Sequence, residues 1–280
     1  MVTPSLDPIL ITGCSSGIGH AAAQLLVRAG HTTYATARRV ETLADLERAG
    51  ARTLSLDVTS EESMQAAVSQ IEAEHGYVGT LVNNAGYGEY GTIEETDLDK
   101  VREMFETNVF GLARLIQLVL PAMRARRSGR IVNISSMGGR FAWPVGGYYH
   151  ATKYAVEALS DALRNEVRQF GIDVVVVEPG PIRSRFEETI NATMADRPSA
   201  DDDSPYADLV ARVQAANAKG YAGPAAADPE VVARRILRIV EAESPRRRYV
   251  VTPAAKALVA AKRFGGDRVW DQLVRQQYGR

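Results

Sequence analysis

Residues 8–19, Pro8-Ile9-Leu10-Ile11-Thr12-Gly13-Cys14-Ser15-Ser16-Gly17-Ile18-Gly19, decide the fold of this chain. The apolar start predicts a buried strand over residues 8–12, and the following pattern predicts a helix over 18–29. The glycines between them have the spacing G-x-x-x-G-x-G, which permits a tight turn and a close approach of the backbone to a ligand. Because a helix N-terminus offers free N–H groups to an anion, the segment predicts a site for a nucleotide pyrophosphate.

Apolar runs alternate with amphipathic segments along the rest of the chain. Strands are expected over residues 8–12, 31–36, 53–57, 80–83, 130–134, 172–178 and 248–252. Helices are expected over residues 18–29, 40–49, 60–74, 97–126, 149–170, 228–243 and 268–278. This alternation predicts an α/β fold, a doubly wound Rossmann-type sheet of about seven parallel strands with helices on both faces. We expect a single domain over residues 1–280, with ligands bound beyond the carboxyl ends of the strands.

Residues 186–227 break this rhythm, because they are rich in Ala, Asp, Ser and Pro and have weak helical periodicity only around 206–216. An insertion of this length within a compact domain predicts a substrate lid. The acidic triplet Asp201-Asp202-Asp203 lacks the ligand spacing of a calcium loop, so we interpret it as a solvated turn and expect no metal site.

The overall composition is that of an ordinary globular protein. The 280 residues are 45% apolar, and 33 basic side chains nearly balance 34 acidic ones, which gives no electrostatic sign of nucleic-acid binding. A single cysteine, Cys14, excludes an intrachain disulfide and fits a reducing cytoplasm. We expect no signal peptide and no integral membrane segment, because no run approaches eighteen apolar residues.

A tyrosine and a lysine, Tyr149 and Lys153, stand four residues apart in a predicted helix, so they share one face. A fixed positive charge stabilises a phenolate and would move its pKa from about 10 toward a useful acid–base range. Ser136, thirteen residues before Tyr149, could orient a carbonyl or alcohol oxygen. An isolated pair of this kind is more commonly a surface feature, so the other motifs must decide. We expect His150 on another face of the helix, without a chemical role.

The second predicted strand bears on the choice of cofactor. NAD-binding domains tend to place a carboxylate about twenty residues after the turn, on the ribose 2′-hydroxyl, whereas an arginine accommodates a 2′-phosphate. Here the strand ends in Ala37-Arg38-Arg39, which favours NADP(H) over NAD(H), unless the arginines only solvate the strand end. Asp57, before Val58, is placed either to hydrogen-bond an adenine or to cap the next helix.

Six motifs now stand in order: Thr12-Gly13-x-x-x-Gly17-x-Gly19, Asn83-Asn84-Ala85-Gly86, Asn108-Val109-x-Gly111, Ser136, Tyr149-x-x-x-Lys153 and Pro179-Gly180. From about residue 7 to 186 the chain resembles the short-chain dehydrogenase/reductase family. Within it, the chain is similar to the branch of hydroxysteroid and retinol dehydrogenases and acyl-dihydroxyacetone-phosphate reductases. The resemblance implies an enzyme that transfers a hydride between NADP(H), with NAD(H) as the alternative cofactor, and a carbonyl or secondary alcohol.

The same resemblance implies the roles of individual residues. Tyr149 would move the proton on the substrate oxygen, Lys153 would lower the pKa of that phenol and bind the nicotinamide ribose, and Ser136 would hold the substrate oxygen. Asn108 would anchor a water in a relay to Lys153. The implied cofactor contacts, besides Tyr149 and Lys153, are Gly13, Ser15, Ser16, Gly17, Ile18, Gly19, Arg38, Asp57, Val58, Asn83, Asn84, Ala85, Gly86, Pro179, Gly180, Ile182 and Ser184. Ser184 stands where many relatives have threonine.

The substrate and partners are less constrained. The apolar residues expected near the site are Met137, Phe141, Trp143, Val145 and Tyr148, with Phe186, Ile190 and Tyr206 in the lid. They could line a pocket for an apolar small molecule such as a steroid, retinoid or lipid ketone, or half of them could be simple packing residues. Two alternatives stay open: a non-catalytic dinucleotide-binding sensor, and a peripheral membrane enzyme that approaches lipid through residues 255–264. Surplus apolar positions on the helices 97–126 and 149–170 predict a homodimer or homotetramer.

Overall fold

The computed structural model describes residues 7–195 and 204–279, and its strands form one parallel sheet in the order β3-β2-β1-β4-β5-β6-β7. The predicted fold class is confirmed, and the ends of the predicted strands shift by at most two residues. The strands are β1 Ile9–Ile11, β2 Thr33–Ala37, β3 Arg52–Ser55, β4 Thr80–Asn83, β5 Gly129–Ile134, β6 Ile172–Glu178 and β7 Arg248–Val250. Because the strand order reverses between β1 and β4, a crevice is expected beyond the carboxyl ends of these two strands.

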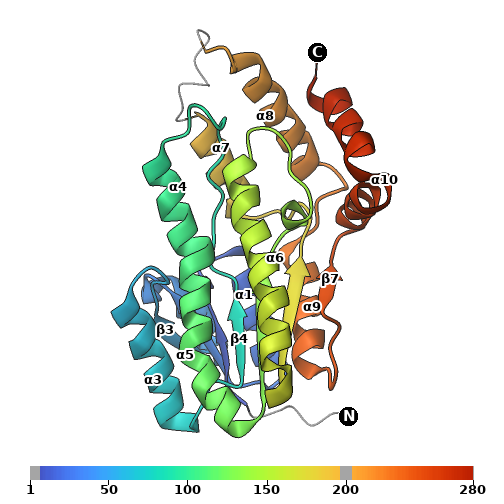
Figure 1. Cartoon of the computed structure of the whole chain (residues 1–280). Coiled ribbons are helices and arrows are strands. Elements are labelled where there is room, and N and C mark those ends of the chain that lie inside the picture. Colours follow the sequence, from blue (N-terminus) through green and yellow to red (C-terminus); the bar gives the residue numbers. More distant parts are fainter. Residues whose placement is uncertain (1–6, 196–203, 280) are drawn as a thin grey trace.

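Helices cover both faces of the sheet (Figure 1). They are α1 Gly17–Arg28, α2 Ala44–Arg48, α3 Glu61–His75, α4 Leu98–Phe105, α5 Gly111–Arg126, α6 Gly147–Val167, α7 Arg185–Ala195, α8 Ala207–Ala222, α9 Pro229–Glu241 and α10 Pro253–Tyr278. Successive side chains of β1 point to opposite faces of the sheet and so contribute to the hydrophobic core on each face. Ile9 and Ile11 pack in the cluster that includes α1 and α9, whereas Leu10 packs in the cluster that includes α3, α5 and α6.

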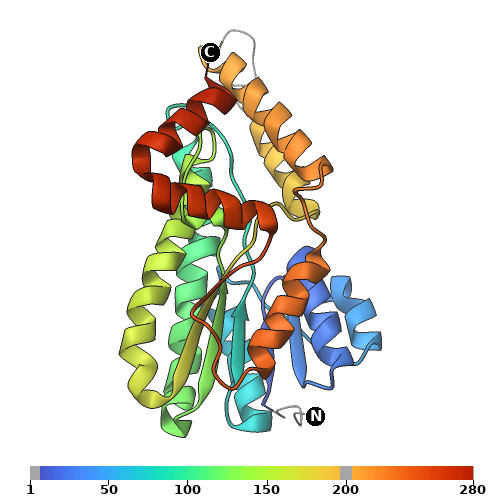
Figure 2. The ribbon, with the colours of Figure 1, turned by 90° about the vertical axis from the view of Figure 1, so that its right-hand side faces the viewer.

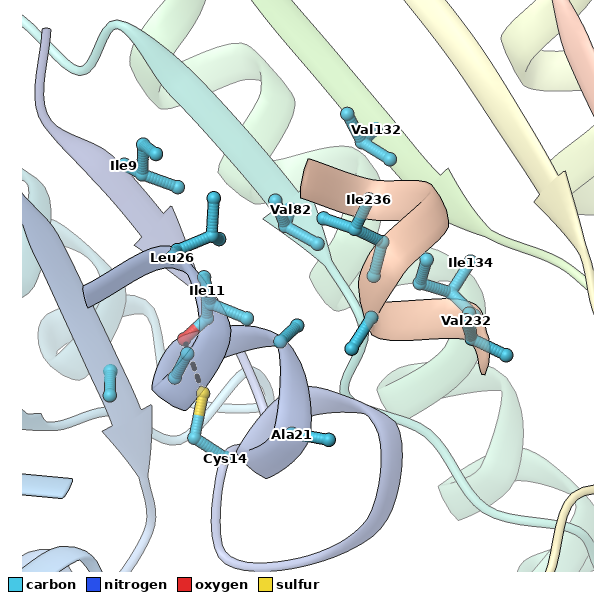
Figure 3. Packing of buried hydrophobic residues seen from close by; sticks show 14 of the residues in the cluster. Ile9, Ile11, Cys14, Ala21, Leu26, Val82, Val132, Ile134, Val232 and Ile236 are labelled. Carbon is cyan, nitrogen blue, oxygen red and sulfur yellow. Dashed lines mark hydrogen bonds between the residues drawn. The ribbon is translucent and has the colours of Figure 1, made fainter. Parts of the chain in front are cut away.

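The first core cluster packs α1 and α9 against one face of the sheet (Figure 3). Leu26 of α1 and Ile236 of α9 are fully buried there, and each such side chain contributes about 1.5–3 kcal/mol by leaving water. Cys14 belongs to this cluster, where its thiol donates to the Ile11 carbonyl at 3.4 Å. Burial raises the pKa of Cys14 to about 12, so this cysteine is an unreactive packing residue.

A third group of helices, α7, α8 and α10, lies beyond the carboxyl edge of the sheet (Figures 1 and 2). The predicted lid therefore contains two helices and is more helical than the weak periodicity over 206–216 indicated. The triplet Asp201-Asp202-Asp203, predicted to be a turn, lies outside the described residues.

The C-terminal helix α10 begins at Pro253, whereas the sequence predicted its start near residue 268. Its start has a cap that the prediction overlooked, because the Thr252 hydroxyl accepts a hydrogen bond from the Ala255 N–H at 3.2 Å. The helix bends at Gly266, which has φ 65°, and the bend brings Trp270 against Phe141 with ring centroids 4.3 Å apart. Within residues 7–195 and 204–279, none of the helices is long and apolar enough to cross a membrane.

The long helix predicted over residues 97–126 is interrupted. A π-helical turn, Glu106–Phe110, separates α4 from α5. Such a turn accommodates an extra residue within a helix and is frequent at functional sites. Here it contains Asn108, whose side chain is 2% exposed.

Candidate active site

A cavity of about 1380 Å³ lies at the carboxyl edge of the sheet, from the glycine turn to the helices α7, α8 and α10. Most of the residues that the sequence predicted for the site line it. These are Gly13, Ser15, Ser16, Gly17, Ile18, Arg38, Asp57, Val58, Asn84, Ala85, Gly86, Ser136, Tyr149, Lys153, Pro179, Gly180, Ile182 and Ser184. Gly19, Asn83 and Asn108 do not line the cavity, and their contacts give them other positions.

The glycine turn is tied to the loop after β4. The Thr12 hydroxyl accepts hydrogen bonds from the N–H groups of Asn84 and Ala85, at 3.0 and 2.9 Å. The Asn84 amide donates to the carbonyls of Thr12 and Gly13, at 2.9 and 3.0 Å. A Cβ at Gly13 would lie 2.8 Å from the Ala85 Cα, and one at Gly19 would lie 2.5 Å from the Asn84 amide nitrogen. Gly19 and the Asn84 side chain therefore hold the turn in place.

The start of α1 faces the cavity. Gly17 has φ +60°, and the hydroxyl of the N-cap residue Ser16 makes no capping hydrogen bond. Ser15, Ser16, Gly17 and Ile18 all line the cavity. This arrangement presents the first backbone N–H groups of a long helix to the cavity, which suits an anion.

Arg38, Asp57 and Val58 line the cavity at the ends of β2 and β3. The Asp57 carboxylate accepts hydrogen bonds from the N–H and the hydroxyl of Thr59, at 2.9 and 2.7 Å. Ser60, not Asp57, is the N-cap of α3, so the capping alternative for Asp57 is wrong. Arg38 is exposed at the cavity, and no hydrogen bond or ion pair joins its guanidinium to another described residue.

Tyr149 and Lys153 occupy one face of α6, and Ser136 follows β5 beside them. The Lys153 ammonium lies 5.8 Å from the centroid of the Tyr149 ring and donates to the Ile134 carbonyl at 3.0 Å. The Ser136 hydroxyl accepts from the Gly138 N–H at 3.0 Å, which orients its oxygen. Both Tyr149 and Lys153 are buried, with 6% and 7% of their surfaces exposed.

Burial dominates the electrostatics of this pair. It raises the pKa of Tyr149 to about 12, against a lowering by the hydrogen bond with Ser136. It lowers the pKa of Lys153 to about 8, although the nearby Glu157 carboxylate acts to raise it. The expected lowering of the Tyr149 pKa is therefore not found, because loss of solvation of the phenolate outweighs the favourable interactions.

Asn108 lies behind the cavity wall. Its amide nitrogen donates to the Tyr87 carbonyl at 2.8 Å and to the Thr152 hydroxyl at 3.2 Å, and its oxygen accepts from the Tyr87 N–H at 3.1 Å. A Cβ at Gly86 would lie 2.9 Å from that oxygen. The π-helical turn thus uses Asn108 to fix the loop after β4 against α6. Asn83 is also internal, with its amide donating to the Asn133 side chain at 2.9 Å.

The opposite wall follows β6. A Cβ at Gly180 would lie 2.1 Å from the Thr252 hydroxyl, so only glycine fits between this loop and α10. Ser184 lies close to Gly17, because a Cβ added to Gly17 would be 3.3 Å from the Ser184 Cβ. The Ser184 hydroxyl accepts a hydrogen bond from the Phe186 N–H at 3.4 Å. Ser184 therefore connects the glycine turn with α7.

A buried charged cluster lies on the α6 and β6 side of the site. Arg248 of β7 donates from Nε to the Glu157 carboxylate at 2.9 Å, and this nitrogen lies 3.3 Å from the Glu178 carboxylate. Burial, and then the charge of Glu157, raises the pKa of Glu178 to about 7, whereas Arg140 and Arg248 act to lower it. Glu157 follows Lys153 by one helical turn, so the cluster contributes to the charge balance around the lysine.

The part of the cavity next to Tyr149 is aromatic. The Tyr149 ring packs against Tyr90 and Phe186, with centroids 5.6 and 5.4 Å apart. Of the apolar residues predicted near the site, Met137, Trp143, Phe186 and Ile190 line the cavity, whereas Phe141, Val145, Tyr148 and Tyr206 do not. The prediction missed Tyr90, Asn217, Tyr221 and Tyr278, which also line it. No local motif marks these residues, because the fold brings them together from distant segments.

His150 also lines the cavity, which its predicted position on another face of the helix did not lead us to expect. Its Nδ1 lies 3.0 Å from the Gly138 carbonyl oxygen, and its Nε2 is buried without a hydrogen-bond partner among the described residues. The loop between β5 and α6 lies against the imidazole through Gly138, so the cavity borders more than one face of the helix.

Fold and site define a class: a Rossmann-type nucleotide-binding sheet with a buried serine–tyrosine–lysine group at its carboxyl edge. The family model of the short chain dehydrogenases matches residues 7–195, and the chain belongs to the short-chain dehydrogenase/reductase family. It is an oxidoreductase of that type.

Curated relatives agree with the predicted branch of the family. The oxidoreductase YbbO of Escherichia coli is 36% identical over 95% of this chain and 93% of its own length. The 3-ketodihydrosphingosine reductase of Bacteroides thetaiotaomicron is 38% identical over 90% of each chain. Human retinol dehydrogenase 8 is 38% identical over 69% of this chain and 65% of its own length.

Solved structures show the same fold. A short-chain dehydrogenase from Streptomyces avermitilis has 35% identity and a TM-score of 0.81, with 98% of each chain covered. A serine dehydrogenase complexed with NADP+ has 26% identity and a TM-score of 0.75, covering 88% of this chain and 94% of its own. A family member from Burkholderia phymatum in complex with NAD has 25% identity and a TM-score of 0.78, covering 94% of this chain and 95% of its own.

Proposed function

We propose that this protein transfers a hydride between NADP(H) and a carbonyl or secondary alcohol of an apolar substrate, with Tyr149 as the general acid and base. The observation that supports it best is the convergence of Ser136, Tyr149 and Lys153 on one cavity that begins at the glycine turn. A site that only bound a nucleotide would not need a buried phenol beside a buried ammonium.

The residues present fit a nicotinamide dinucleotide. The cavity of about 1380 Å³ reaches from the exposed Arg38, past the start of α1, to Tyr149. Ser15, Ser16 and Gly17 would hold the pyrophosphate at the helix N-terminus. Arg38 would bind a 2′-phosphate, and β2 ends without a carboxylate that would favour the 2′-hydroxyl of NAD. When bound, the nicotinamide supplies or accepts the hydride.

The protein's own groups handle the proton. The Ser136 hydroxyl orients the substrate oxygen, and the Tyr149 hydroxyl donates a proton to it during reduction or removes one during oxidation. A tyrosine with a pKa of about 12 is protonated at neutral pH, so it can act as the proton donor in carbonyl reduction. Lys153 supplies positive charge beside the phenolate that forms and would bind the nicotinamide ribose. Asn108 would position a water between the loop at Tyr87 and Lys153.

The aromatic part of the cavity favours an apolar substrate. Tyr90, Phe186 and Trp143 provide apolar surface, and α7 and α8 act as the substrate lid. Two relatives, the 3-ketodihydrosphingosine reductase and retinol dehydrogenase 8, support a lipid-like ketone or alcohol as the substrate.

The test of the catalytic role is Tyr149→Phe. We expect NADPH binding to persist and turnover to fall by at least about 100-fold, since general acid–base catalysis contributes that much or more. The matched control is Tyr148→Phe, because Tyr148 is the adjacent tyrosine, does not line the cavity and donates its hydroxyl to the Ile93 carbonyl. Full activity in the Tyr149 variant would rule out the mechanism.

The test of cofactor preference is Arg38→Ala, measured as the KM for NADPH and for NADH. Loss of a charge-assisted bond to a 2′-phosphate should raise the KM for NADPH about tenfold or more and leave that for NADH nearly unchanged. Arg48→Ala serves as the matched control, because Arg48 is an exposed arginine of α2 that does not line the cavity. Equal increases for both cofactors would show that Arg38 does not recognise the 2′-phosphate.

We further infer a homo-oligomer formed through the α4–α5 and α6 surfaces. Phe110 and Leu98 are 56% and 52% exposed there, and Tyr154 and Leu159 of α6 are 43% and 41% exposed. Apolar side chains of this size, gathered on neighbouring helices, support a contact with a second copy of the chain.

A further inference from the structure

The second half of α10, residues 267–278, presents one row of side chains to the part of the cavity beyond Tyr149. Trp270, Val274 and Tyr278 are spaced four residues apart and so share one face of the helix. Trp270 and Tyr278 are 5% and 4% exposed, whereas the residues from 271 to 277 other than Val274 are exposed. The proposed mechanism uses none of these side chains, although Tyr278 lines the cavity.

Contacts of Trp270 with the loop between β5 and α6 fix the start of this row. The Trp270 indole N–H donates to the Ala142 carbonyl at 2.9 Å. The Trp270 ring lies 4.3 Å from the Phe141 ring and 6.1 Å from the Trp143 ring, measured between centroids. The second half of α10 is therefore attached to the loop that leads into the helix of Tyr149.

The end of the row is fixed by α8 and by the same loop. Beyond the bend at Gly266, the second half of α10 runs beside α8 (Figure 2), and Tyr278 packs in the same buried cluster as Val210 and Val213 of α8. The Tyr278 ring faces Trp143 edge-on, with centroids 6.5 Å apart. The last turn of the chain is thus a packed part of the cavity wall.

Aromatic rings connect the reacting phenol with Tyr278. The ring centroids of Tyr149 and His150 are 5.8 Å apart, and those of His150 and Trp143 are 6.1 Å apart. Trp143 is in turn the ring that Tyr278 faces, and all four residues line the cavity. The dinucleotide would fill the cavity from Arg38 to Tyr149. A substrate with its carbonyl at Tyr149 would therefore have its apolar remainder in the part that Trp143 and Tyr278 line.

We propose that Tyr278 is a specificity-determining residue whose ring limits the length of the apolar chain that the cavity accepts. The occupant would be the chain of a lipid-like ketone or alcohol, with its end against the Tyr278 ring. This inference rests on the proposed function. A chain that fits gains about fourfold in kcat/KM for each methylene group that it buries, whereas a chain that is too long meets the ring.

The test measures kcat/KM with NADPH for a series of unbranched 2-alkanones from 2-hexanone to 2-hexadecanone. In the wild-type enzyme, kcat/KM should rise with chain length to a maximum and fall beyond it. Tyr278→Ala removes the ring, so the maximum should move to a ketone at least about two carbon atoms longer. Tyr278→Trp should move it to a shorter ketone, because the larger ring takes space from the chain. Tyr278→Phe keeps the ring and should leave the maximum unchanged.

The matched control is Gln276→Ala, because Gln276 is exposed in the same turn of α10 and does not line the cavity. This variant should leave the maximum in place. A purely structural role of Tyr278 would lower kcat/KM for all ketones in proportion without moving the maximum. That result in the Ala variant, or the lack of a maximum in the wild-type enzyme, would overturn the proposal. Should the Ala variant not fold, Tyr278→Leu makes the same prediction with a smaller shift.

Failure of the proposed function gives a different result. If the wild-type enzyme reduces none of the ketones, their dissociation constants from the NADPH complex are measured along the same series. Tightest binding at one chain length, moved to a longer ketone by Tyr278→Ala, would support the role of Tyr278 while contradicting reduction of this class. Equal dissociation constants along the series, or no binding at all, would refute the length limit.

Discussion

Replacing Lys153 with methionine should stabilise the fold near neutral pH while removing activity. Burial lowers the pKa of Lys153 from 10.5 to about 8, so the folded state disfavours its charge. A shift of this size corresponds to about 3 kcal/mol of lost stability wherever the lysine is charged in both states. Methionine would remove that cost but would also lose the hydrogen bond to the Ile134 carbonyl, worth about 1 kcal/mol. The expected net gain at pH 7 is about 2 kcal/mol.

The sign of the pH dependence follows from the direction of this shift. Below a pH of about 8 the wild-type protein has the full cost, and the cost disappears as the pH rises from 8 toward the unfolded value of 10.5. Urea unfolding of both proteins at pH 7 and pH 10 should therefore show a gain of about 2 kcal/mol that falls to near zero at the higher pH. Lys256→Met, at an exposed lysine of α10, should change stability by less than about 0.5 kcal/mol at pH 7. A destabilised Lys153→Met protein at pH 7, or a gain independent of pH, would refute the assignment of a buried, strained ammonium.

Two further substitutions test the framework of the site by unfolding measurements. Gly13→Ala should lower the free energy of unfolding by about 2–5 kcal/mol, because φ is +72° and the new Cβ would lie 2.8 Å from the Ala85 Cα. The control Gly76→Ala, at φ +84° with open space around it, should lower it by only about 1 kcal/mol. Equal losses would show that the close approach of Gly13 to Ala85 does not determine the cost. Arg248→Met should cost about 3–5 kcal/mol at pH 8, because it leaves Glu157 and Glu178 buried without their main cation. The loss should be smaller at pH 5, since Glu178, with a pKa raised to about 7, is then protonated. A loss that is the same at both values would contradict this coupling.

The sheet could be predicted from the sequence because its signals are local. Each central strand is a short, continuous apolar run, and Gly30, Gly50 and Gly76 end helices visibly. The missed features depend on tertiary contacts. The π-helical turn at Asn108 leaves no periodic mark in one sequence. The first half of α10 has weak amphipathicity, but Ala255 holds it in the same buried cluster as Phe141.

In the site, too, the features with local signals could be predicted, and those that depend on tertiary contacts could not. Ser136, Tyr149 and Lys153 were predicted from spacing, and the structure brings all three to one cavity. The burial of Tyr149 was not predictable from spacing. It raises the pKa of Tyr149, whereas the neighbouring lysine was expected to lower this pKa. That His150 lines the cavity was not foreseen, because a helical wheel does not show the loop at Gly138 that packs against it. Tyr278, contributed by α10, could be assigned to the cavity only once the path of that helix was known.

The bond between Thr12 and the loop after β4 has a consequence for the order of events during synthesis. It joins residues 72 positions apart, so the glycine turn is anchored only after β4 has emerged and paired beside β1. The cavity wall next to Tyr149 is completed later, because it includes Tyr278 of the last helix. A growing chain would therefore complete the nucleotide end of its cavity well before the end that surrounds Tyr149. The entropy of closing these long loops is regained only when the distant segments meet.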